Sequence, residues 1–122
     1  MIIGTGIDLV SISRFQEMPR KDRLAKRILT ENEYTEFTNT VDQGLYLARV
    51  WAVKEAASKS FGTGIADDVV WKNMQLSKSD RGQPILQLQK ELQTKNMQCH
   101  VSISHDGDML IATAILSNVS RS

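Results

Sequence analysis

The sequence lacks the features that mark secreted and membrane-spanning proteins. It contains a single cysteine, Cys99, so no intramolecular disulfide can form. Its longest nearly apolar run, Met109 to Leu116, is far shorter than the roughly 20 residues needed to cross a bilayer. The chain starts with Met-Ile-Ile-Gly, without the basic and long apolar regions of a signal peptide. We therefore expect a soluble protein of the cytoplasm.

An excess of charge of one sign is also absent. Fifteen Lys and Arg residues face 14 Asp and Glu residues, and the net charge of +1 gives no general electrostatic reason to bind nucleic acid or a membrane. The 122 residues, 41% hydrophobic and 24% charged, predict one globular domain over 1–122. Such a chain buries only about two thirds of its unfolded surface, so a large substrate calls for a site shared between subunits.

The balanced total hides one basic segment, residues 14–27. Six basic and two acidic residues give it a local charge of +4. The basic residues are Arg14, Arg20, Lys21, Arg23, Lys26 and Arg27; the acidic ones are Glu17 and Asp22. Such a segment attracts an acidic partner and speeds its encounter. The alternative is a solvated helix face.

The first third of the chain predicts a strand followed by short helices. Residues 2–12 favour a strand in which Gly4 and Gly6 permit a close backbone approach or a bulge. Pro19 then separates two short helices. A third helix begins at the capping-box pair Thr30 and Glu33 and runs to about Asn39.

Residues 43–61 give the strongest helix signal. They contain no proline, are rich in Ala and Leu, and end at Gly62, a residue suited to a helix C-terminus. Because apolar residues cover much of its circumference, we expect a central, largely buried helix. Four strands are expected after it, at 69–77, 85–88, 100–104 and 110–116. The predicted class is α+β, a mainly antiparallel sheet packed on the central helix.

Two carboxylates occupy positions that are costly for an unpaired acid. Asp8 lies within a predicted strand, and Glu55 lies midway along the most apolar helix. Together they would suit Mg²⁺, which takes oxygen ligands and often only one or two protein carboxylates. The alternatives are an i,i+4 pair of Glu55 with Lys59, and backbone N–H groups donating to Asp8.

Two further segments have residues suited to binding phosphate. Lys59 to Gly64 offers a cation, hydroxyls and a flexible backbone, as in a phosphate-binding nest, although a plain helix end explains the same residues. His105 follows a predicted strand, where it is suited to bind phosphate or transfer a proton; a solvated turn histidine is the alternative.

These motifs, taken in order, resemble the bacterial holo-acyl-carrier-protein synthases, the small class of 4′-phosphopantetheinyl transferases. The segments that carry the resemblance are Gly6 to Val10, Arg27 to Thr30, Trp51 to Ala56, Lys59 to Ile65 and Ser102 to His105. The resemblance implies transfer of 4′-phosphopantetheine from coenzyme A to a serine of apo-acyl carrier protein, with release of 3′,5′-ADP, in support of fatty acid biosynthesis. It also implies a homotrimer with active sites between subunits.

The same resemblance implies roles for individual residues. Asp8 and Glu55 would be the Mg²⁺ ligands, and Lys59 would meet the phosphates of coenzyme A. The coenzyme A site would also include Gly62, Thr63, Gly64 and His105. Arg14, Arg20, Arg23 and Arg27 would dock the acidic recognition helix of the carrier protein. For the base that takes the serine proton, Glu55, Asp8 and a metal-bound water remain alternatives.

The chain departs from the family pattern at three places. Val50 stands where a basic residue usually precedes the aromatic residue of the helix motif, and Arg49 lies one position earlier, about 100° around the helix. Gln83 replaces a frequent lysine before Pro84. Residues 39–43 lack the basic residues that contact the nucleotide 3′-phosphate in some relatives. These differences predict an altered affinity for coenzyme A.

Two other interpretations predict different behaviour. A non-catalytic module would use the basic helix to hold an acidic protein or RNA. A structural α+β domain would bind no coenzyme A at all.

Overall fold

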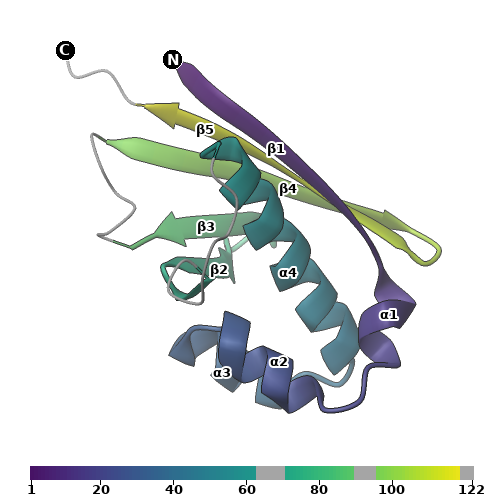
Figure 1. Cartoon of the computed structure of the whole chain (residues 1–122). Helices are drawn as coiled ribbons and strands as arrows, with labels where there is room; N and C mark the ends of the chain where they lie inside the picture. Colours follow the sequence, from purple (N-terminus) through teal and green to yellow (C-terminus); the bar gives the residue numbers. More distant parts are fainter. Residues whose placement is uncertain (63–70, 90–95, 119–122) are drawn as a thin grey trace.

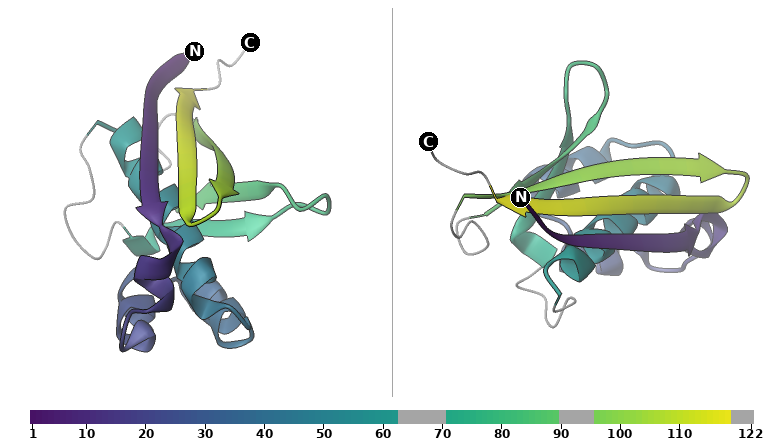
Figure 2. Two further views of the ribbon diagram at one scale, coloured as in Figure 1. Left: turned by 90° about the vertical axis from the view of Figure 1, so that its right-hand side faces the viewer. Right: turned by 90° about the horizontal axis from the view of Figure 1, so that it is seen from above.

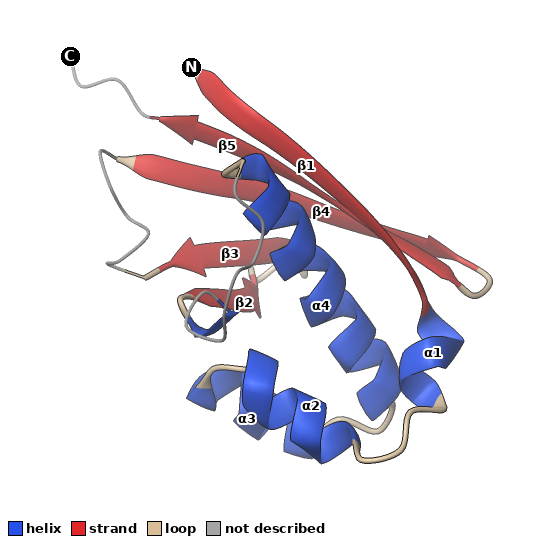
Figure 3. Ribbon diagram, viewed as in Figure 1, coloured by secondary structure: helices blue, strands red, loops and turns tan. Residues whose placement is uncertain are grey.

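The computed structural model describes residues 1–62, 71–89 and 96–118 (Figure 1). Helices and strands in these residues follow the order β1 (Ile2–Ser11), α1 (Ile12–Gln16), α2 (Lys21–Ile28), α3 (Glu31–Thr38), α4 (Gln43–Ser60), β2 (Met74–Lys78), β3 (Pro84–Leu88), β4 (Met97–Asp106) and β5 (Met109–Asn118). The expected α+β class is confirmed, with the strands and helices distinguished in Figure 3.

Two antiparallel sheets form the β part. The larger has the strand order β1-β5-β4, with Gly6 opposite Ala114 and Ile103 opposite Ala112. The smaller is the β2–β3 hairpin, which extends away from the larger sheet (Figure 2). Helix α4 lies across one face of the larger sheet, while α2 and α3 lie near the first half of α4 (Figure 1).

The backbones of β1 and α4 approach unusually closely. A Cβ atom added to Gly6 would lie 1.9 Å from the Ala56 carbonyl oxygen, and one added to Gly4 would lie 1.9 Å from that of Ser60. The close approach predicted for these glycines is therefore confirmed, and a register shift between Ile2 and Gly4 also supplies the expected irregularity. Because side chains alternate along a strand, Asp8 faces α4 as well.

The opposite face of β1 carries exposed apolar side chains, whereas Val10, at the end of the α4 face, is buried in the core. Ile3, Ile7 and Leu9 are 45%, 54% and 58% exposed. Met109 and Ile115 of β5 continue this exposed apolar face, at 44% and 40%. The larger sheet is thus covered on one face by α4 and leaves an apolar surface open on the other.

Helix α4 is the predicted central helix. Asp42 caps its start by accepting a hydrogen bond from Leu45 N at 3.0 Å, and Gly62 follows its end with φ +83°. Its buried residues include Lys54, which is 0% exposed. Within the described residues no helix is both long and apolar enough to cross a membrane.

The strand predicted from residue 69 begins later, at Met74. Residues 69 and 70 lie outside the described part, and Trp71 and Lys72 lie in a helical turn. The physical reason is a tertiary contact: the Trp71 carbonyl accepts a hydrogen bond from Lys54 Nζ at 2.8 Å. The same ammonium donates to Ile28 O at 2.8 Å and pairs with Glu33 at 2.7 Å. Lys54 therefore joins α2, α3 and α4 to the chain before β2.

Candidate active site

Asp8 is held against α4 with one oxygen unused. The side chain is 15% exposed, and its Oδ1 lies 3.2 Å from Lys59 Nζ. Its Oδ2 is buried and has no hydrogen-bond partner among the described residues. A buried carboxylate oxygen without a partner is costly. This oxygen is therefore available to a cation.

Glu55 lies on the side of α4 that faces Asp8. Burial raises the pKa of its carboxyl group most strongly, and the negative charge of Asp8 raises it further. The positive charges of Lys59 and Arg14 act in the opposite direction. Trp51, Glu55 and Lys59 are spaced four residues apart, so they lie along one side of the helix.

Lys59 bridges the helix and the strand. Its ammonium donates hydrogen bonds to Ile7 O at 2.8 Å and to Asp8 Oδ1 at 3.2 Å, while its side chain stays 49% exposed. Within the described residues its ion pair is thus with Asp8 and not with Glu55. The lysine can therefore reach a phosphate group without leaving the site.

The two carboxylates meet the chemical requirements of Mg²⁺. No group of three or more potential metal-ligating His, Cys, Asp or Glu side chains occurs among the described residues. Mg²⁺ needs no such group, because water and substrate phosphates commonly complete its six oxygen ligands. Asp8 supplies an unsatisfied oxygen, and Glu55 supplies a second carboxylate whose ionised form gains from a nearby cation.

The residues expected to bind coenzyme A are not all together in one chain. Gly62 follows the end of α4, near the start of β1, whereas Thr63 and Gly64 lie outside the described residues. His105 is exposed near the β4–β5 turn and lies opposite Leu110, which in turn pairs with Val10 at the far end of β1. The end of α4 and the β4–β5 turn lie at opposite ends of the larger sheet (Figure 1), so Gly62 and His105 are far apart within one chain.

The basic segment divides into two parts. Arg20, Arg23 and Arg27 line a groove of about 310 Å³ that also has an apolar lining of Met18, Pro19 and Leu24. Arg14 lies elsewhere: its guanidinium is 5.4 Å from the ring centre of Trp51 and 5.0 Å from that of Phe15. Sequence reasoning had grouped all four arginines, and no local pattern indicates that one of them packs on α4.

Arg49 and Val50 line the same small cavity of about 40 Å³. Lys78 and Pro84 of the β2–β3 hairpin also line it. Arg49 and Lys78 thus border the cavity next to Val50, the position where the family usually has a basic residue. Lys78 was missed at the sequence level because the hairpin is brought to α4 only by tertiary packing.

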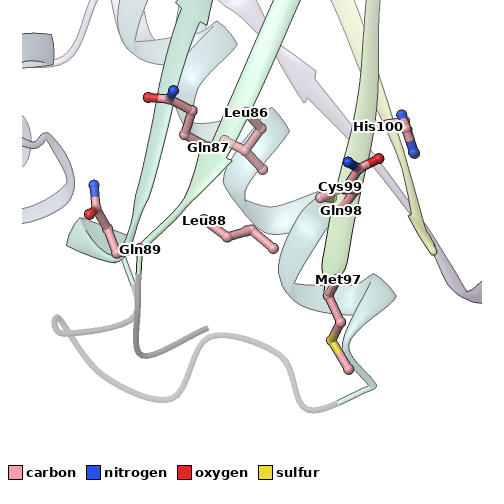
Figure 4. A pocket seen from close by; sticks show the side chains of 8 residues that line it. All are labelled: Leu86, Gln87, Leu88, Gln89, Met97, Gln98, Cys99 and His100. Atoms are coloured by element: carbon pink, nitrogen blue, oxygen red, sulfur yellow. The ribbon is translucent and has the colours of Figure 1, made fainter. Parts of the chain in front are cut away.

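A larger cavity, about 490 Å³, opens between β3 and β4 (Figure 4). Its lining comprises residues 86–89 and 97–100. These residues include no carboxylate, ammonium or guanidinium group, and none was predicted to belong to the active site. The charged side chains that can handle phosphate and metal gather instead between β1 and α4.

Comparisons with known proteins match both the sequence and the fold. The chain is 36% identical over 124 residues to a holo-acyl-carrier-protein synthase of Dechloromonas aromatica, with 97% of this chain and 99% of that protein covered. The crystal structure of the Neisseria meningitidis holo-acyl-carrier-protein synthase superposes with a TM-score of 0.86 at 31% identity, covering 97% and 100% of the two chains. That of a Bacillus anthracis holo-acyl-carrier-protein synthase in complex with CoA (3′,5′-ADP) gives 0.83 at 34% identity, covering 98% and 99%.

The family profile spans most of both sheets and all four described helices. Residues 4–114 match the profile of the 4′-phosphopantetheinyl transferase superfamily. This range contains Asp8, Glu55 and Lys59, and it ends within β5. The chain belongs to the 4′-phosphopantetheinyl transferase superfamily.

Proposed function

We propose that the chain is a holo-acyl-carrier-protein synthase. It transfers 4′-phosphopantetheine from coenzyme A to a serine of apo-acyl carrier protein and releases adenosine 3′,5′-bisphosphate, in support of fatty acid biosynthesis in the cytoplasm. The observation that carries this proposal is the convergence of Asp8, Glu55 and Lys59 between β1 and α4, in a single domain over 1–122 that belongs to this superfamily. Neither a non-catalytic module nor a purely structural domain accounts for a buried, unsatisfied carboxylate oxygen.

Asp8 and Glu55 would hold Mg²⁺ in this reaction. When bound, the ion supplies positive charge that offsets the negative charge of the pyrophosphate of coenzyme A. The support for this role is the free Oδ2 of Asp8 and the mutual repulsion of the two carboxylates, which a cation would relieve.

Lys59 would bind a phosphate oxygen of coenzyme A. Its exposed ammonium already lies beside Asp8, so the Lys59 side chain could neutralise the charge of the phosphate with little rearrangement. The serine oxygen of the carrier protein forms a bond to the β-phosphorus, and the bond from that phosphorus to the bridging oxygen breaks. The leaving group carries the electron pair away as adenosine 3′,5′-bisphosphate.

We propose Glu55 as the base for the serine proton, because its carboxylate lies beside Asp8 at the proposed metal position. Burial and the charge of Asp8 raise the pKa of this carboxyl group in the metal-free chain, and a bound cation would offset part of that rise. The proton would move from the serine hydroxyl to a Glu55 carboxylate oxygen.

The groove with Arg20, Arg23 and Arg27 would dock the acidic recognition helix of the carrier protein. An acidic amphipathic helix presents both carboxylates and apolar side chains, and the groove offers guanidinium groups beside Met18 and Leu24. Arg14 would meet the carrier protein closer to the reacting serine, because it packs on Trp51 one helical turn from Glu55.

A homotrimer would complete the coenzyme A site. The exposed apolar face of β1 and β5 offers Ile3, Ile7 and Leu9 to a second copy of the chain. The large separation of Gly62 from His105 within one chain supports sites built from two subunits. In such a site the Gly62–Gly64 loop and Lys59 of one copy would meet His105 of its neighbour around coenzyme A.

Intact-mass spectrometry tests the reaction directly. Apo-acyl carrier protein is incubated with the chain and coenzyme A, either with Mg²⁺ or with EDTA. We expect the carrier mass to rise by one phosphopantetheine with Mg²⁺ and to stay unchanged with EDTA. No gain with several carrier proteins and a folded enzyme would contradict the proposed activity; an equal gain in EDTA would contradict the metal.

A further inference from the structure

Asp108, in the turn between β4 and β5, fastens the start of α1. Its Oδ1 accepts a hydrogen bond from Ser13 N at 2.8 Å, and its Oδ2 accepts from Ser13 Oγ at 2.9 Å and from Ser11 Oγ. Its backbone carbonyl accepts from Ile12 N at 2.7 Å. Three consecutive residues at the β1–α1 junction are thus bound to one aspartate.

This contact replaces a local helix cap. Ser11 is the N-cap residue of α1 but makes no side-chain capping bond within the helix. The carboxylate of Asp108 satisfies the Ser13 N–H instead, and the hydrogen bonds from Ser11 and Ser13 hold the pKa of Asp108 below its ordinary value. Since α1 has only five residues, it has little stability of its own and depends on such an anchor.

The anchored helix carries Arg14 directly after Ser13. The guanidinium of Arg14 lies over the rings of Phe15 and Trp51, and its positive charge lowers the pKa of Glu55. Arg14 and Lys59 are therefore cations on the two sides of the Asp8–Glu55 pair. An arginine side chain has many rotamers, so its place there depends on where α1 holds its Cα atom.

We propose that Asp108 is a positioning residue: through Ser13 and α1 it holds Arg14 against Trp51, at the Glu55 end of the candidate active site, where the carrier serine enters. This inference rests on the proposed function. It assigns a role to the β4–β5 turn, which contacts α1 although the two segments are far apart in the sequence. No motif of the sequence indicates this contact.

The kinetic test compares Asp108→Ala with Asp106→Ala. Asp106 is the exposed last residue of β4, directly before the same turn, and makes none of these contacts. We expect Asp108→Ala to lower kcat/KM for the carrier protein about tenfold with the KM for coenzyme A unchanged, because only the carrier side is misplaced. Asp106→Ala should match the parent chain. A loss shared equally between carrier protein and coenzyme A, or no loss, would overturn the inference.

A double-mutant cycle separates positioning from general stability. In an Arg14→Ala background we expect Asp108→Ala to change kcat/KM for the carrier by less than about twofold, because its effect passes through Arg14. A full, additive loss in that background would show that Asp108 acts by another route and would overturn the inference.

A fluorescence measurement tests the geometry independently of the reaction. In a Trp71→Phe background, Trp51 is the remaining tryptophan. Acrylamide quenching of Trp51 should increase in Asp108→Ala to the level of Arg14→Ala, and Asp106→Ala should stay at the parent level. Unchanged quenching in Asp108→Ala overturns the positioning of Arg14. Increased quenching in a chain that transfers no phosphopantetheine instead overturns the proposed function, and with it the catalytic part of this inference.

Discussion

The two faces of β1 have opposite chemistry, and each opposes what simple burial rules suggest. The face toward α4 carries Gly4, Gly6 and the polar Asp8 before its one buried apolar residue, Val10, while the face toward solvent carries Ile3, Ile7 and Leu9. The buried face is small because the helix backbone lies almost in contact with the strand. The exposed face is apolar because, in our proposal, a second copy of the chain covers it.

In the proposed function, this difference lets a short chain form a site for phosphate. The glycines bring α4 so close to β1 that Lys59 pairs with Asp8, and Glu55 lies near enough for the charge of Asp8 to raise its pKa. The apolar side chains, displaced to the other face, become available for association. In our proposal, β1 thus contributes to catalysis with one face and to assembly with the other.

The largest expected effect comes from adding a side chain to the face of β1 that meets α4. Gly6→Ala places a methyl group 1.9 Å from the Ala56 carbonyl oxygen, so α4 must move away from β1. We expect the free energy of unfolding, measured in urea, to fall by about 3 kcal/mol or more, as in severe overpacking. Gly82→Ala is the matched control: its site is open but has φ +82°, so about 1 to 2 kcal/mol should be lost. Equal losses in both variants would show that the close approach is not what matters.

A smaller effect is expected from introducing a charge into the exposed apolar face of β1. Ile7→Glu leaves the isolated subunit folded, since the side chain is 54% exposed, but introduces a charge into the proposed subunit interface. We expect light scattering to show the trimer replaced by smaller species, with association weakened by about 2 kcal/mol or more. Val41→Glu, on a fully exposed residue of the α3–α4 loop, should leave the mass unchanged. A trimer that survives Ile7→Glu would contradict the role given to this face.

The smallest effect concerns the pair of carboxylates formed by Asp8 and Glu55. The folded-state pKa of Glu55 is raised, so its ionisation opposes folding. In the metal-free protein, the stability that protonated Glu55 contributes at low pH is lost as pH rises through the folded-state pKa. At pH 8 in EDTA we expect Glu55→Gln to increase the free energy of unfolding by roughly 0.5 kcal/mol. The gain should vanish at acidic pH. Glu17→Gln, at an exposed site, should have no such pH-dependent effect; an identical response of both variants would refute the explanation.

Local signals predicted much of the fold correctly. Pro19 separates α1 from α2, and Thr30 and Glu33 form the expected capping box at the start of α3. Helix α4 was predicted over 43–61 and ends at Ser60, one residue earlier, with Phe61 and then Gly62 following it. These features succeed because each depends on residues close together in the sequence.

Contacts between distant segments could not be predicted in this way. The alternation of residues shows that β1 has two faces but not which of them meets α4. The strand predicted from residue 69 begins later because Lys54 holds Trp71 in a helical turn. Likewise, no pattern separates Arg14 from the other arginines, since its place depends on Trp51 and on the turn at Asp108. The candidate carboxylates were found early because a charged residue in an apolar element needs an explanation from its own neighbours.

The most direct test of the account is the initial rate of phosphopantetheine transfer by Asp8→Ala, measured by intact-mass spectrometry at saturating coenzyme A and Mg²⁺. Asp80→Ala, at an exposed residue of the β2–β3 turn, is the matched control, and circular dichroism establishes that both variants are folded. The account predicts that Asp8→Ala loses about a thousandfold or more in rate, while Asp80→Ala keeps the parent rate. A folded Asp8→Ala that transfers within about tenfold of the parent rate would show that the reaction does not depend on the carboxylate that β1 presents to α4.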